Sequence, residues 1–307
     1  MSITAQMVKE LRLKSSAGMM DCKKALTETN GDMDAAVDWL RKKGLATASK
    51  KAGRVASEGL IGIKLNDKSG AIVEVNSETD FVARNEEFQT FVNDISSIAL
   101  DNSADLSKIL SSNFPGSSKN VQDTLSDKIA KIGENMSIRR ADMLSVSSGA
   151  VIGYMHNSVK DDLGKIGVLV ALESNADKSL LQKLGKELAM HIAATSPSSL
   201  SIDDLSNDLV ERERKILIDQ AMSSGKPEEI AKKMVEGRLR KFYSEVVLLE
   251  QVFVIDGETK VSDVIKKVSK ELNEDIKINS FVRYNLGEGI EKNTKNFADE
   301  VADQLSG

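Results

Sequence analysis

The chain has 307 residues, which is enough for about two domains at the usual ~150 residues each. Its 42 Lys and Arg against 47 Asp and Glu give a formal net charge of −5, which argues against a protein that coats nucleic acid. Aromatic residues make up only 4% and Pro occurs three times, a composition that favours helix.

Cysteine, histidine and hydropathy narrow the class of protein further. The single Cys22 excludes an intrachain disulfide, and with His156 and His191 it makes a poor zinc ligand set. The longest apolar run, residues 166–172, is far shorter than the ~20 residues of a membrane-spanning helix, and the N-terminus has no export signal. We therefore expect a soluble, reduced, cytoplasmic chain with no membrane contact.

Residues 1–45 are predicted to form three short helices. A Gly-Met-Met turn at 18–20 leads to a second helix capped by Asp21, and the third begins after Asp32 and stops at Gly44. A glycine-methionine turn in so small a bundle resembles ubiquitin-associated domains, a likeness of fold that says little about function.

A basic stretch follows at 41–57. It has no acidic residue, and its cations are Arg41, Lys42, Lys43, Lys50, Lys51 and Arg54. We interpret 46–57 as a solvated basic linker or exposed helix, because no aromatic side chains interleave to stack on bases. The alternative is an RNA- or ribosome-binding module that uses 41–54.

Beyond residue 58 the pattern predicts a duplicated core of antiparallel sheet with a covering helix. Both copies follow the order strand, turn, strand, helix: 60–65, 66–70, 71–75 and 88–99 in the first, then 149–154, 159–164, 166–172 and 180–192 in the second. Gly62 and Gly153 are expected at equivalent places. The first subdomain is 58–145, and the second begins with 146–199.

The second subdomain is predicted to be interrupted by a helical hairpin at 200–248. Its helices span 205–222 and 228–247, and their apolar residues are enough for self-packing or for a partner. The subdomain resumes at 249–284 with a strand at 252–255, a helix at 261–272 and a strand at 276–284. A small C-terminal module, 285–307, ends in a charged helix from about Asn296. The predicted fold class is α+β.

No pattern of side chains predicts an enzyme, a cofactor or a bound metal. No Gly-rich phosphate loop is complete. His156 with Asp161 and Asp162 allows a general-base pair, but a turn histidine beside solvated acids is favoured. His191 is interpreted as a core histidine and Cys22 as a packing residue.

The segment 76–85, between a strand and its helix, differs from its counterpart 173–177 by carrying an aromatic residue. Thr79 or Asp80 can cap the helix, which places Phe81 in its first turn. Phe81 lies seven residues before Phe88, so periodicity alone favours a core residue over a functional one.

Five segments in a fixed order resemble bacterial elongation factor Ts, the guanine-nucleotide exchange factor family for elongation factor Tu, and the resemblance extends from end to end. The segments are AGMMDCKKAL at 17–26, TDFVA at 79–83, KIGEN at 131–135, GKP at 225–227 with MVEGR at 234–238, and GEGIEK at 287–292.

The resemblance implies a partner and a set of contact residues. The loop that matches the family's magnesium-dislocating segment consists of Thr79, Asp80, Phe81 and Val82. Docking residues implied by the resemblance are Arg12, Met19, Met20, Ile132, Gly133, Glu134 and Asn135. It also implies dimerisation through 200–248 and a C-terminal module that touches the partner, with no direct contact to nucleic acid.

Several of these residues keep a second interpretation. Met19 and Met20 could fill the small core, although we expect at least one to be exposed, and 132–135 could simply be a helix stop. One departure from the family is the turn at 157–165, which looks longer than usual and leaves a partner role for His156 in doubt.

Overall fold

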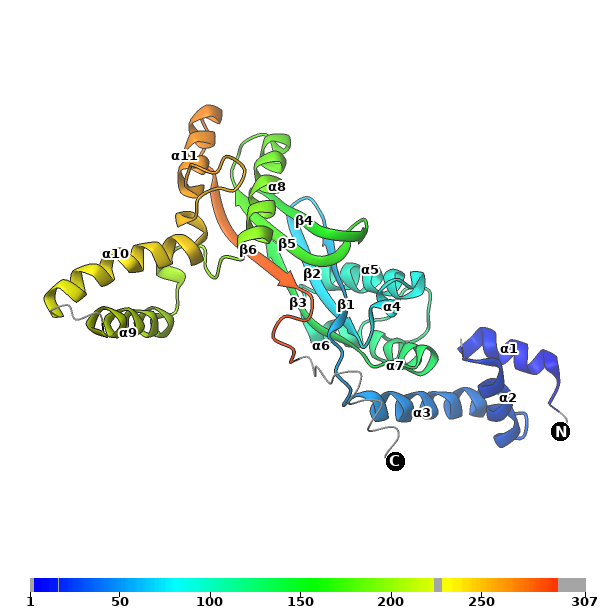
Figure 1. The fold of residues 1–307 in the computed structure, drawn as a ribbon. Coiled ribbons are helices and arrows are strands. Elements are labelled where there is room, and N and C mark those ends of the chain that lie inside the picture. The colour runs from blue at the N-terminus through cyan, green and yellow to red at the C-terminus, as the bar shows by residue number, and fades with distance from the viewer. Residues whose placement is uncertain (1–2, 16, 224–227, 292–307) are drawn as a thin grey trace.

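A six-stranded antiparallel sheet forms the centre of the molecule in the computed structural model, which describes residues 3–15, 17–223 and 228–291 (Figure 1). The strands are β1 (Glu58–Leu65), β2 (Ser69–Ser77), β3 (Met136–Ser145), β4 (Gly149–Lys160), β5 (Leu163–Glu173) and β6 (Lys277–Asn285). Their order is β3-β2-β1-β5-β4, and β6 also pairs with β5. The two predicted hairpins thus share one sheet, joined where Ile61 pairs with Gly164 and Gly62 with Leu163.

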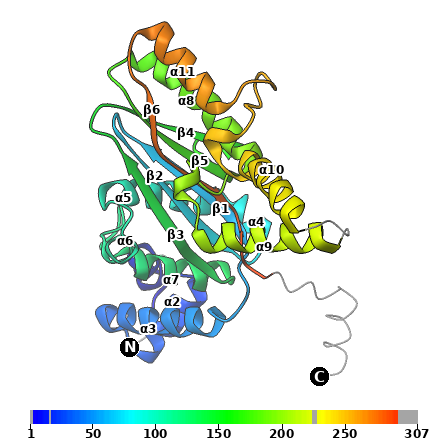
Figure 2. The ribbon, with the colours of Figure 1, turned by 90° about the vertical axis from the view of Figure 1, so that its left-hand side faces the viewer.

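Helices cover each half of this sheet. The β1–β3 half packs on α5 (Glu86–Asp101), α6 (Leu106–Ser111) and α7 (Val121–Ile132), and the β4–β6 half on α8 (Lys178–Thr195) and α11 (Val261–Leu272). In α5, apolar residues at helical spacing such as Phe88, Val92 and Ile95 are fully buried. Figure 2 shows α8 and α11 at the end of the sheet away from the N-terminal helices.

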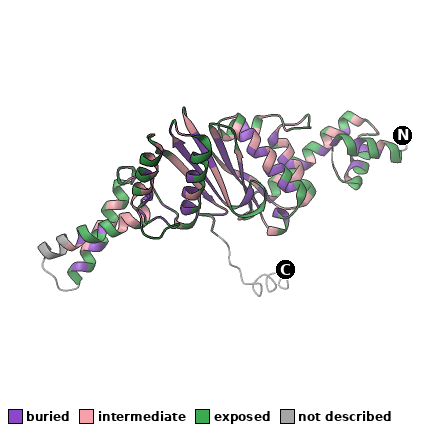
Figure 3. Cartoon of the chain, turned by 90° about the horizontal axis from the view of Figure 1, so that it is seen from above, coloured by how far each residue is buried: buried purple, intermediate pink, exposed green. Residues whose placement is uncertain are grey.

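Alternate strand residues build a further cluster on the opposite face of the sheet. Val73 and Val75 of β2 join the cluster under α5, whereas Ile72 joins the cluster that contains Leu169 and Tyr284. Figure 3 shows buried residues concentrated in the sheet and on the helix faces that meet it.

The three predicted N-terminal helices are α1 (Ala5–Ser15), α2 (Met19–Glu28) and α3 (Met33–Lys51), and two of their predicted ends are wrong. Helix α2 begins at Met19 with Gly18 as N-cap, so Asp21 lies in the first turn and does not cap it. Helix α3 does not stop at Gly44 but runs to Lys51, so half of the predicted 46–57 linker, residues 46–51, is helical. Packing of α3 along α7 and of Ala48 on the core offsets the ~1 kcal/mol that glycine costs a helix.

The helical hairpin consists of α9 (Asn207–Ser223) and α10 (Glu228–Val246), held together by Leu217, Val235 and Leu239. Short 3-10 turns, Ile202–Asp204 and Leu248–Glu250, lie where the hairpin leaves and rejoins the core. The turn predicted between α9 and α10 lies outside the described residues, as does the helix predicted from about Asn296.

The strand predicted at 252–255 is wrong. These residues form a loop with only an isolated bridge between Val252 and Lys260, and Gly257 turns it with a φ of 72°. Phe253 is buried, but Val254 and Ile255 on the same loop are exposed. Only Phe253 of this apolar run reaches the core, and it does so from a loop without strand pairing.

The second hairpin differs from its prediction at its turn and at its glycines. Strand β4 continues to Lys160 with a register shift after Ser158, so the expected long turn is a two-residue connection between longer strands. A Cβ at Gly62 would meet Ser96 of α5, whereas a Cβ at Gly153 would meet Ile63 and Leu65 of β1. The two glycines are therefore not equivalent.

Candidate partner-binding surface

Phe81 is the most exposed aromatic side chain among the described residues. It lies on α4 (Asp80–Ala83), a single helical turn, and 75% of its surface is exposed. The next two residues, Val82 and Ala83, are each only 5% exposed and pack in the apolar cluster under α5. The turn is thus anchored by its second half while the phenylalanine side chain points into solvent.

The core position that periodicity alone favours for Phe81 is wrong because the helix is interrupted. Helix α4 ends at Ala83 and α5 begins at Glu86, so Phe81 and Phe88 do not share a helical face. Asn85 makes the break, since its side chain accepts hydrogen bonds from the backbone N–H groups of Glu87 and Phe88 at 2.8 and 3.3 Å.

The side chain of Glu134, in the segment after α7, binds Thr79, the residue before α4. Thr79 donates its backbone N–H to one carboxylate oxygen at 3.0 Å and its hydroxyl to the other at 2.7 Å. Thr79 is the N-cap residue of α4, as the sequence allowed, but its hydroxyl bonds Glu134 and not the helix. The structure brings two separately predicted groups, 79–82 and 132–135, into one site.

The segment 132–135 is also the helix stop that the sequence allowed. Helix α7 ends at Ile132, and Gly133 caps it in the left-handed conformation with a φ of 87°. The backbone N–H of Asn135 donates to the Glu78 carboxylate, and its side-chain amide donates to the carbonyl of Arg54 at 2.7 Å. The site therefore also contacts the segment that follows α3.

Arg12, Met19 and Met20 lie elsewhere, on α1 and α2 (Figure 1). Both methionines are exposed, Met19 by 59% and Met20 by 75%, which meets the expectation for at least one of them. They share a shallow apolar groove with a basic rim, lined by Ile3, Thr4, Ala5, Val8, Lys9, Arg12, Met19, Met20 and Lys23.

The basic stretch is largely engaged within the chain. Arg41 pairs with Asp123 of α7 at 2.6 Å, and Lys43 pairs with Asp21. Lys51 donates to the Gly133 carbonyl, and Arg54 lies 3.5 Å from Glu78. The Lys43 pair joins α3 to α2, whereas the other three contacts join the end of the N-terminal segment to the first half of the sheet. These four cations are therefore less free for RNA phosphates than the sequence implied.

The residues considered for catalysis are not assembled into a catalytic group. His156 is exposed, and its Nδ1 lies 3.1 Å from the Tyr154 hydroxyl. His191 is buried between Gln251 and the backbone N–H of Val254, and burial lowers its pKa although the Gln251 hydrogen bond opposes this. Cys22 is fully buried.

Neither a metal cluster nor a membrane helix occurs in the described part of the chain. Within residues 3–15, 17–223 and 228–291, no three His, Cys, Asp or Glu side chains lie together as metal ligands would. Among the helices of the same residues, none combines the length and the apolarity needed to cross a bilayer.

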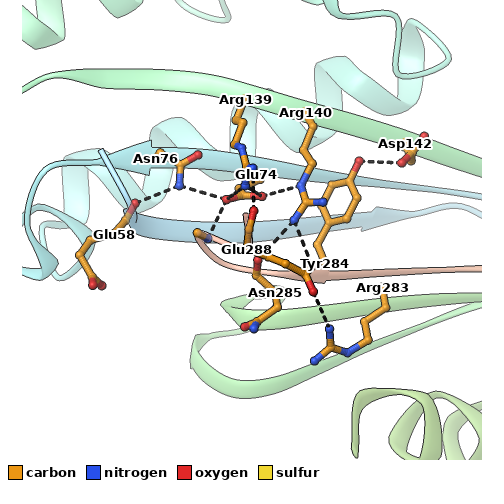
Figure 4. Close-up of polar contacts among 11 residues, drawn as sticks. Glu58, Glu74, Asn76, Arg139, Arg140, Asp142, Arg283, Tyr284, Asn285 and Glu288 are labelled. Atoms are coloured by element: carbon orange, nitrogen blue, oxygen red, sulfur yellow. Dashed lines mark hydrogen bonds and ion pairs between the residues drawn. The ribbon is translucent and has the colours of Figure 1, made fainter. Parts of the chain in front are cut away.

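A buried charge network, which the sequence analysis missed, anchors the segment before the C-terminus (Figure 4). Glu74 of β2 is fully buried and bonds Arg139 at 3.1 Å, Arg140 at 2.6 Å and the backbone N–H of Gly287 at 2.9 Å. Burial raises the pKa of Glu74, but the hydrogen bonds from Gly287, Arg140 and Asn76 outweigh it and the pKa is lowered. The single acidic residue in the apolar strand 71–75 was the sequence signal that could have indicated this network.

This network ties three parts of the chain together. Arg139 also donates to the Glu288 carbonyl at 2.6 Å, and Arg140 stacks on the Tyr284 ring at 4.0 Å. Gly287 has a φ of 71°, and a Cβ there would collide with the Ser57 carbonyl. The loop after β6 is thus held against both β2–β3 and the end of the N-terminal segment.

The fold is of the α+β class, and exposed apolar side chains lie on α2 and α4. A family model described as Elongation factor TS matches residues 78–288. Relatives named Elongation factor Ts include those of Rhodospirillum centenum, 60% identical over 98% of both chains, and Parvibaculum lavamentivorans, 58% identical over 98% of this chain and 97% of its own. That of Bartonella tribocorum is 54% identical over the whole of both chains.

The chain belongs to the elongation factor Ts family. It is thereby an elongation factor of protein biosynthesis, and family membership supports a role in guanine-nucleotide exchange during translation elongation.

Proposed function

We propose that this protein binds elongation factor Tu with bound GDP, inserts the Thr79–Val82 turn beside the nucleotide, displaces Mg²⁺ and so releases GDP. The observation that carries the proposal is Phe81, a large apolar side chain 75% exposed on a turn whose neighbours Val82 and Ala83 are buried. Burial of this side chain in a partner protein would remove its apolar surface from water, which is favourable.

The mechanism needs no catalytic residue of its own. A GTPase holds its nucleotide through backbone amides, a lysine and Mg²⁺, so a conformer with a poor Mg²⁺ site binds nucleotide weakly. If Phe81 stabilises that conformer, linkage requires that nucleotide weaken the binding of Phe81 to the same extent. The protein therefore speeds exchange in both directions and is not a permanent inhibitor.

Phe81 cannot supply all of the binding. Burying one phenylalanine contributes about 1.5–3 kcal/mol, or about one to two decades of affinity. We assign further docking to Arg12, Met19 and Met20, whose groove combines an apolar floor with a basic rim. Ile132, Gly133, Asn135 and the C-terminal module from 285 complete the proposed surface. Glu134, for which the resemblance also implies docking, binds Thr79 of the same chain.

The architecture behind this surface is also a proposal. We interpret 1–45 as a ubiquitin-associated-like docking module, and 58–145 with 146–199 and 249–284 as a duplicated core. In support, Gly59 and Gly149 each open a hairpin with positive φ, at 125° and 112°, where a Cβ would strike a carbonyl of the partner strand. These glycines are the equivalent pair in place of Gly62 and Gly153.

The hairpin 200–248 is proposed to form a homodimer, and the protein to act in the cytoplasm. Leu209, Ile216 and Met222 of α9 are 40%, 42% and 52% exposed, which leaves apolar surface for a second copy. Sedimentation over a range of concentrations tests this part, and a monomer at every concentration contradicts it.

The central experiment measures release of labelled GDP from purified elongation factor Tu, with wild-type protein and with Phe81→Ala. We expect the folded variant to lose most of the stimulation. Stimulation equal to that of the wild type would remove Phe81 from the mechanism.

A further inference from the structure

We infer that Glu134 is a positioning residue for exchange: it aims Phe81 at the partner and does not itself bind the partner. This inference rests on the proposed function, because it assigns the reason why Phe81 enters elongation factor Tu efficiently.

The first reason is the use of both oxygens of the carboxylate. Oε2 accepts the backbone N–H of Thr79 at 3.0 Å, and Oε1 accepts its hydroxyl at 2.7 Å. Hydrogen bonds to an ionised acceptor are short and strong, and a two-point contact fixes direction as well as distance. The Glu134 carboxylate is therefore already occupied inside this chain.

The second reason is where Thr79 lies. It is the N-cap of α4, with φ −124° and ψ 158°, two residues before Phe81. Its backbone angles set the direction in which the single turn of α4 leaves β2. A carboxylate that clamps both the N–H and the hydroxyl of Thr79 therefore sets the direction of the Phe81 side chain.

The other end of the turn is fixed independently. Val82 and Ala83 are buried in the core, and the buried side chain of Gln89 donates to the Ala83 carbonyl at 3.2 Å. Phe81 thus stands between two anchors, and Glu134 supplies the N-terminal one. Without the Glu134 anchor, α4 must become ordered while Phe81 enters the partner. This ordering lowers the rate of GDP release at a saturating concentration of the factor.

Glu134 is itself held in place by its neighbours. Gly133 turns the chain with a φ of 87°, and Lys51 donates to its carbonyl. Asn135 binds Glu78 through its backbone N–H and Arg54 through its side chain. Residues 133–135 are thus braced on the end of α3, and the carboxylate they present does not depend on the partner for its orientation.

The test is a double-mutant cycle on GDP release from elongation factor Tu, with Phe81→Ala, Glu134→Ala and both together. We expect Glu134→Ala to lower the maximal rate about tenfold with little change in the half-saturating concentration of the factor. In the Phe81→Ala background the same substitution should change the rate by less than about twofold, because a residue that acts through Phe81 has nothing left to position.

Conservative variants separate positioning from a general loss of structure. Thr79→Val removes the hydroxyl and keeps the backbone N–H, so it should lower the maximal rate by less than Glu134→Ala. Glu134→Gln keeps the length and one acceptor and should recover part of the rate, whereas Glu134→Asp is one methylene short and should not. Glu271→Ala, an exposed acid on α11, is the matched control for loss of one charge.

The outcomes distinguish this inference from the proposed function. If Phe81→Ala slows release and Glu134→Ala slows it by the same factor in both backgrounds, Glu134 binds the partner directly and the inference is overturned while the proposed function stands. A higher half-saturating concentration with an unchanged maximal rate would also overturn it. If Phe81→Ala exchanges like the wild type, the proposed function itself fails.

Discussion

The two halves of the sheet differ at the point where a strand gives way to its covering helix. After β5, Asp177 caps α8 directly by accepting the backbone N–H of Ser179 at 2.9 Å. After β2, the extra turn α4 is inserted, and only then does Asn85 cap α5. The same strand-to-helix junction is thus a plain connection in one half and the support of an exposed phenylalanine in the other.

The halves also differ on the opposite face of the sheet. Strand β5 places Leu169 and Ala171 there, both fully buried, whereas β2 places Ile72 and then the charged Glu74. The half that carries Phe81 therefore also carries the charge network that holds the loop after β6. The exposed phenylalanine and the buried charge network thus lie in the same half of the sheet, and the other half has neither at the matching positions among the described residues.

Glu74→Ala should have the largest effect, on stability. It leaves Arg139, Arg140 and the Gly287 N–H without their buried acceptor, and breaking a buried ion pair from one side costs about 3–5 kcal/mol. Urea unfolding measures the loss, with exposed Glu258→Ala as control. A loss below about 1 kcal/mol would mean that the network is no stronger than a surface pair.

Phe81→Ala should lower the rate of GDP release about 10- to 100-fold, the equivalent of about 1.4–2.8 kcal/mol. Because Phe81 is 75% exposed, the melting temperature of the Phe81→Ala variant should stay within about 2 °C of that of the wild type. Leu180→Ala, at an exposed position in the first turn of α8, is the control from the other half and should exchange normally. Equal losses from both variants would contradict the distinction between the halves.

His191 should make the second half sensitive to mild acid. Its lowered pKa means that the folded state prefers neutral imidazole, so its contribution is present above the unfolded pKa of ~6.5 and is lost as pH falls. We expect the unfolding free energy to fall below pH ~6.5 by at most about 1.4 kcal/mol per unit. In His191→Gln this slope should disappear, and a slope that persists would assign it to another group.

Protonation of Glu74 should also lower the free energy of unfolding, but at a lower pH than protonation of His191. Its pKa is lowered in the folded state, so its contribution is complete above the unfolded pKa of ~4.3 and is lost as pH falls through the folded value. The difference in stability between wild type and Glu74→Gln should therefore shrink below pH ~4. A difference that is constant from pH 7 to pH 3 would contradict the lowered pKa.

Arg41→Ala should have the smallest effect. Arg41 is half exposed and its bond to Asp123 joins α3 to the first half of the sheet, so we expect a loss of less than about 1 kcal/mol that decreases further at high salt. Lys42→Ala, on the same helix, is the control. A larger, salt-independent loss would make this contact a principal support of the N-terminal helices.

Elements with local patterns could be predicted from the amino-acid sequence. The helical spacing from Phe88 to Ala99 predicted α5, the turn at 66–70 predicted the first hairpin, and the residue pattern predicted α11 at its observed bounds. Each depends on neighbours a few residues apart, so periodicity and turn chemistry suffice. The resemblance also identified the family from five short segments.

Other features became evident only in the folded chain, where residues distant in sequence come into contact. Periodicity predicted that Phe81 is a core residue. The break at Asn85 and the burial of Val82 instead leave the Phe81 side chain exposed. Helix α3 passes Gly44 because α7 covers it, and the run 252–255 is a loop because Phe253 reaches the core without strand pairing. Thr79 and Glu134 lie 55 residues apart in sequence and share two hydrogen bonds. Burial and long-range pairing set these outcomes, and among the causes named only the Asn85 cap is local, because it binds Glu87 and Phe88.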